Sequence, residues 1–97
     1  MIVQMFDPDR EYARLLDDPD KSKAVRFLSQ EAASFISIKS MIDSCRDDAD
    51  YERLLPTMVE VSGHIRSSIF KSLKHQYGIL EWRKKRYLNR LFKSLEF

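Results

Sequence analysis

The chain has 97 residues, 43% of them hydrophobic and 33% charged, which suits one domain over residues 1–97 and excludes a disordered or membrane-embedded protein. Its formal net charge of +2 hides an acidic first half and a basic second half. It contains no run of about 18 apolar residues and no basic leader, so we expect neither a transmembrane segment nor a signal peptide.

Helical periodicity dominates the sequence, and two glycines and three prolines provide little material for the tight turns of an all-β fold. We therefore predict an all-α fold. The short connections between its apolar segments favour a small antiparallel bundle of three to four helices. Self-association is a further way in which such a bundle would cover its apolar surface.

The first two helices are expected over about 8–17 and about 19–45. Asp7 is the expected cap of the first, and Asp18, followed by Pro19, caps the second. The inward residues of the first helix are expected to be Tyr12, Leu15 and Leu16. Those of the second are expected to be Val25, Leu28, Ala32, Phe35, Ile36, Ile42 and Cys45.

A polar turn at 46–50 precedes the third predicted helix, and its aspartates suit a helix N-terminus. Pro56 should begin or kink this helix, which we expect to continue unbroken through Gly63 as far as Gly78. Its apolar ladder consists of Leu54, Met58, Val61, Ile65, Ile69, Leu73 and Tyr77.

The fourth helix is expected over about 79–95, or it continues directly from the third if Gly78 does not interrupt them. Its inward residues should be Leu80, Tyr87, Leu88, Leu91 and Leu95. Four large apolar residues lie off the main stripes of the predicted helices, and they are the candidates for a self-association surface: Ile38, Met41, Phe70 and Phe92.

The side-chain groupings that enzymes need are missing from the sequence. The glycines are isolated, His64 and His75 are three helical turns apart, and no local group of Cys, His and carboxylate ligands occurs. Cys45 ends an apolar stripe, so we expect it to be a small buried hydrophobe rather than a nucleophile. We predict no enzymatic activity, no cofactor and no metal site. A single cysteine also favours a cytoplasmic location.

The most informative segment is the basic C-terminal helix. At 100° per residue its cations fall on one stripe opposite the apolar face, and they are Arg83, Arg86, Arg90 and Lys93. Trp82 lies at the margin of this stripe, and Lys71 and Lys74 add charge from a related polar face of the preceding helix. Lys84 lies on the apolar side and would have to extend outward to reach water.

A basic helix face of this kind has four interpretations. It can dock on an acidic protein with Trp82 and Tyr87 as anchors, or it can contact nucleic-acid phosphates. It can also lie on an anionic membrane or remain a solvated exterior. We predict a non-catalytic adaptor or complex subunit that binds an acidic protein partner and forms a homo-oligomer. Nucleic-acid binding is the alternative.

Two stretches of the chain, 73–78 and 87–95, resemble segments in the helical domain of GINS replication-complex subunits. The order of an acidic turn, a long helix and a basic aromatic helix is similar as well. The resemblance implies a subunit of a replication-type complex as one form of the nucleic-acid alternative. It assigns no role to any residue.

Overall fold

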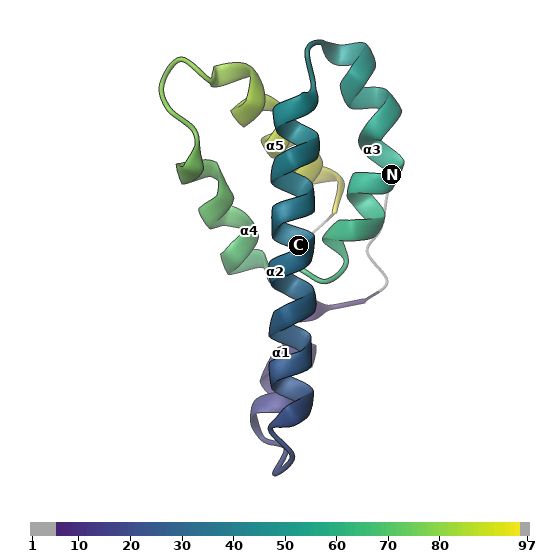
Figure 1. Cartoon of the computed structure of the whole chain (residues 1–97), viewed down its shortest axis with the longest axis vertical. Helices are drawn as coiled ribbons and strands as arrows, with labels where there is room; N and C mark the ends of the chain where they lie inside the picture. The colour runs from purple at the N-terminus through teal and green to yellow at the C-terminus, as the bar shows by residue number, and fades with distance from the viewer. Residues whose placement is uncertain (1–5, 96–97) are drawn as a thin grey trace.

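The computed structural model describes residues 6–95, in which helices joined by short loops are found and no strand (Figure 1). The helices are α1 (Pro8–Leu16), α2 (Ser22–Ser44), α3 (Asp48–Ser62), α4 (Ser67–Leu73), a short 3₁₀ helix η1 (Lys74–Gln76) and α5 (Trp82–Ser94). The all-α prediction is therefore confirmed. Within the described range, no helix is long and apolar enough to cross a membrane.

Helix α2 is the central element of the bundle. It contacts α1, α3, α4 and α5, and Figure 1 shows it running through the middle of the molecule, with α3 on one side and α4 on the other. The main core lies around the C-terminal half of α2, where Ile38 and Ile42 are fully buried. A smaller cluster of Leu15, Ala24 and Phe27 fixes α1 to the N-terminal half of α2.

The predicted inward face of α2 is wrong for four of its seven residues, Val25, Leu28, Ala32 and Ile36. Val25 is 62% exposed and Ile36 is 67% exposed, whereas Ile38 is completely buried. The helix has two apolar stripes, and packing against α3 and α5 covers the one that contains Ile38 and Ile42. Leu28 and Ala32 also belong to the exposed stripe, whereas the burial predicted for Ile42 and Cys45 is confirmed.

Similar corrections apply to residues outside α2. Leu16 is 48% exposed and Leu80 is 93% exposed, because α1 covers the core with Leu15 and α5 begins only after Leu80. Phe70 is 1% exposed and, like Ile38, belongs to the core rather than to a self-association surface. The predicted inward residues of the last helix that are buried are Tyr87, Leu88, Leu91 and Leu95.

The start of α2 also differs from the prediction. Asp18 accepts a hydrogen bond from the backbone N–H of Asp20 at 2.8 Å, and Asp20 accepts one from that of Ser22 at 3.1 Å. These side chains build a turn, so the helix begins at Ser22 instead of Pro19. The predicted cap of α1 is confirmed, since Asp7 accepts from the backbone N–H groups at the start of that helix.

The third predicted helix is not continuous. It breaks after Ser62 because the backbone N–H of Arg66 donates to the Glu31 carboxylate at 3.0 Å, and a helix would have paired that N–H with the Ser62 carbonyl. The Arg66 guanidinium adds two bonds to Glu31, at 2.7 and 2.8 Å. Asp9 of α1 accepts from Ser67 at the start of α4. Two carboxylates distant in sequence therefore fix where α4 begins.

Pro56 lies inside α3, which starts eight residues earlier at Asp48. The alternative in which Pro56 begins the helix is therefore wrong. The predicted role of the polar turn is confirmed, because Asp47 caps α3 and accepts from the backbone N–H of Asp50 at 2.9 Å.

Candidate partner-binding groove

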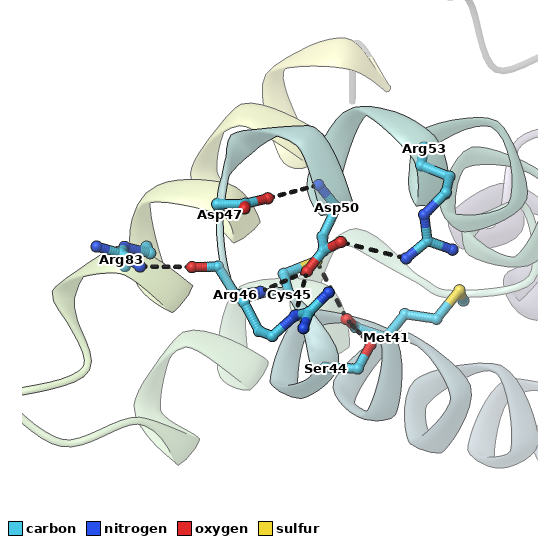
Figure 2. Close-up of polar contacts among 8 residues, drawn as sticks. All are labelled: Met41, Ser44, Cys45, Arg46, Asp47, Asp50, Arg53 and Arg83. Atoms are coloured by element: carbon cyan, nitrogen blue, oxygen red, sulfur yellow. Dashed lines mark hydrogen bonds and ion pairs between the residues drawn. The ribbon is translucent and has the colours of Figure 1, made fainter.

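The predicted arginine stripe of α5 faces the start of α3. Arg90 forms an ion pair with Glu52 at 2.8 Å, and Arg86 lies 3.8 Å from Asp48. Arg83 donates to the backbone carbonyl of Arg46 at 2.6 Å, as Figure 2 shows. Three of the four predicted cations in this stripe therefore already have partners within the chain. The acidic residues of α3 also share the surface with them.

Figure 2 shows the α2–α3 turn that Arg83 contacts. Its centre is Asp50, which accepts from the Arg46 backbone N–H at 3.0 Å, from the Arg46 side chain at 3.1 Å and from Arg53 at 3.3 Å. These hydrogen bonds, the one from the Arg46 backbone most of all, lower the pKa of Asp50 to about 2. The Asp50 carboxylate is therefore already hydrogen-bonded within the turn, and the turn supports α5 through the contact with Arg83.

Tyr87 cannot serve as the anchor that the sequence suggested. It is 1% exposed, stacks on Tyr51 with ring centroids 4.8 Å apart, and donates its hydroxyl to Asp48 at 2.9 Å. Trp82 differs, because it is 59% exposed at the first turn of α5 and the Arg83 guanidinium lies 5.7 Å from its ring. Of the two proposed anchors, only Trp82 is accessible.

A groove of about 620 Å³ lies between α4 and α5, and we call it the basic groove. Its aromatic and aliphatic lining residues are Phe70, Tyr77, Leu88 and Phe92. Its polar lining residues are Lys71, Lys74, His75, Lys85 and Asn89. No carboxylate is among the described residues that line it, so three lysine charges surround an apolar floor.

The three lysines of the basic groove have no ion-pair partner within residues 6–95. The ammonium group of Lys71 lies 5.7 Å from the centre of the Phe92 ring, where its stem covers apolar surface. Lys84 provides the contrast, since it lies 3.3 Å from both Asp43 and Glu81. Charges in a concave apolar setting produce a stronger field than the same charges on a flat face. The groove is therefore suited to an anionic ligand.

The loop that joins the two walls of the basic groove is strongly apolar. Ile79 is 89% exposed and Leu80 is 93% exposed, and Trp82, after the cap residue Glu81, begins α5. In Figure 1 this loop connects the α4 side to α5 at the end of the molecule distant from α1. Exposed apolar residues next to a charged groove are typical of a protein contact surface.

The structure separates the predicted site residues into three groups. Lys71 and Lys74 line the basic groove, and Trp82 is the first residue of α5, the helix that forms one of its walls. Arg83, Arg86 and Arg90 face α3 instead, and Lys93 is exposed outside the groove.

Sequence reasoning missed Lys85 and Asn89. The signal was their spacing: Lys85, Asn89 and Phe92 recur at four and three residues and thus share one side of α5, away from the arginine stripe.

No group of three potential metal ligands occurs in the described part of the chain. Cys45 is 7% exposed with its thiol directed at the Met41 carbonyl, and burial is the main cause of the increase in its pKa. Comparisons with protein-family models, with curated proteins and with solved structures found no match for this chain.

Proposed function

We propose that this chain is a non-catalytic binding module, an adaptor or a complex subunit, which holds an acidic protein segment in the basic groove. The observation that carries the proposal is the lining of that groove. Lys71, Lys74 and Lys85 converge on an apolar floor without a carboxylate among them. A segment with an aromatic or aliphatic side chain between Asp and Glu residues would satisfy both the charge and the floor.

The exposed loop next to the groove would extend the contact. Trp82 is the accessible aromatic residue beside it, and Ile79 and Leu80 have no cover within the described residues. Binding hot spots are enriched in tryptophan and are surrounded by contacts that exclude water. We infer that a partner covers this loop while its acidic segment occupies the groove.

Charge placement favours an acidic protein over nucleic acid. A phosphate backbone needs several unpaired cations along an open face. On the stripe that would provide them, Arg86 and Arg90 are paired with Asp48 and Glu52, and these carboxylates would repel phosphates. The groove itself has the size of a few side chains rather than of a duplex.

The test is a titration with a short fluorescent peptide in which one phenylalanine is flanked by glutamates and aspartates. We expect saturable binding that weakens with salt and changes the emission of Trp82, the single tryptophan of the chain. Lys85→Glu should raise the Kd about fivefold to tenfold, since it removes one attraction and adds one repulsion, each worth about 0.5–0.7 kcal/mol, the middle of the range for exposed charge pairs.

The matched control is Arg10→Glu, which makes the same charge change on α1, where the Arg10 side chain is 88% exposed. This control should leave the Kd within about twofold of wild type, because exposed charges beyond a Debye length of about 8–10 Å are screened. Equal losses in both variants would contradict the groove as the site. Tighter binding of a labelled single-stranded or duplex oligonucleotide, retained in Lys85→Glu, would favour the nucleic-acid alternative instead.

A further inference from the structure

The outer face of α2 exposes large apolar residues and carries no exposed charge between residues 27 and 38, in a chain that is one-third charged. Val25 is 62% exposed, Leu28 is 37% exposed and Ile36 is 67% exposed. Between residues 27 and 38 the one charged side chain is Glu31, which is 5% exposed and paired with Arg66. Depletion of charge distinguishes the core of a protein interface from ordinary surface. The function proposed above involves the basic groove and its neighbouring loop, and it does not involve this face.

The shape of this face is a ridge between two hollows. Ile36 lines both of them. One hollow, of about 380 Å³, lies toward α4 and includes Leu28, Ala32 and Ile69. The other, of about 450 Å³, lies toward α3 and includes Ser37 and Val61. A protruding apolar side chain beside apolar hollows can pack against a second copy of itself.

Charges at the two ends of the face determine how two copies would pair. Arg26 lies eleven residues before Ser37, three helical turns, so it is on the α3-facing side of α2 about 16 Å from Ser37. Glu60 lies on α3 next to Val61, which shares a hollow with Ser37. Both Arg26 and Glu60 are exposed, and neither has an ion-pair partner within residues 6–95.

We propose that the outer face of α2 is a homodimer interface in which two α2 helices cross antiparallel around a two-fold axis near Ala32. This axis is perpendicular to α2 and lies in the interface, so the α3-facing sides of both copies are on the same side of the dimer, and the two α2 helices run in opposite directions. Because α3 runs antiparallel to α2 (Figure 1), Arg26 of one copy then comes level with Glu60 of the other. Ile36 comes level with Leu28. A parallel pair would instead place the two α3-facing sides on opposite sides of the interface, so Arg26 of one copy would lie away from Glu60 of the other.

The test is sedimentation equilibrium of the full chain over a range of concentrations. We expect a reversible dimer, and Ile36→Glu should raise its dissociation constant by about tenfold or more because a charge would be buried in the interface. Leu16→Glu is the control, since it changes a leucine of α1 that is 48% exposed outside this face. Circular dichroism should show that both variants keep their helices.

Charge exchange tests the geometry. Arg26→Glu and Glu60→Arg should each weaken the dimer, and the double variant should restore it, because the pair is re-formed with opposite signs. A wild-type chain that stays monomeric at high concentration would overturn the proposal. So would a dimer that survives Ile36→Glu, or a double variant that is weaker than both single ones.

Discussion

The ion pair between Glu31 and Arg66 should contribute strongly to stability. Glu31 accepts three hydrogen bonds from Arg66, from the backbone N–H and from two guanidinium nitrogens, at 2.7 to 3.0 Å. Glu31→Gln keeps the shape of the side chain, but it places an amide NH₂ against the guanidinium and leaves the positive charge of Arg66 without its partner. Removing one member of a buried pair costs about 3–5 kcal/mol. Because the Arg66 side chain is 19% exposed, we expect the lower end, about 3 kcal/mol.

The assay is urea unfolding followed by far-ultraviolet circular dichroism. In thermal unfolding of the same variant, a loss of about 3 kcal/mol corresponds to a fall in Tm of about 12–24 °C for a domain of this size. Glu11→Gln is the control, because it removes a carboxylate paired with Arg14, whose side chain is 61% exposed, and we expect little change. A destabilisation below about 1 kcal/mol in Glu31→Gln would refute the reasoning, since the pair would then be exchangeable with water.

Three further outcomes are expected. The folded-state pKa of Asp50 is about 2, below its ordinary value of 3.8. The stability that the ionised carboxylate contributes is therefore complete above about pH 4 and is lost as the pH falls toward 2. Urea unfolding across this pH range should show a loss of stability in the wild-type chain that Asp50→Asn lacks. Asp47→Ala should lower the unfolding free energy by about 1 kcal/mol in the same assay, because it removes the cap of α3. Cys45 should react slowly with a thiol reagent in the folded protein and rapidly in urea, since burial raises its pKa, and equal rates would contradict its burial.

Local signals in the sequence were sufficient for much of the fold. The caps Asp7 and Asp47 and the buried stripe of α5 follow from residue type and spacing, which are properties of one helix. The break at Ser62 could not be predicted in this way. Its cause is a contact between residues 31 and 66, which are brought together only when α2 and α4 pack.

The two stripes of α2 show the same limit. Val25 and Ile36 are eleven residues apart, and Ile38 and Ile42 are four apart. Both spacings keep a pair on one side of a helix, so periodicity identifies two apolar faces without indicating which one the core covers. On α5, the sequence located the arginines on one stripe but did not reveal that Glu52 would lie opposite Arg90. The basic groove could be predicted only in part, because its charge comes from two helices whose relative position depends on the break before α4.

The most direct test of the account is a two-dimensional ¹H–¹⁵N correlation titration of the labelled chain with the acidic phenylalanine-containing peptide. We predict that the amide signals that shift cluster on the walls of the basic groove, at Lys71, Lys74, Lys85 and Asn89, and extend to Trp82. Signals of the arginine stripe, represented by Arg86 and Arg90, should move little because these side chains are already paired. Shifts confined to that stripe, or no shifts at all at low salt, would contradict the claim that the groove is the binding site.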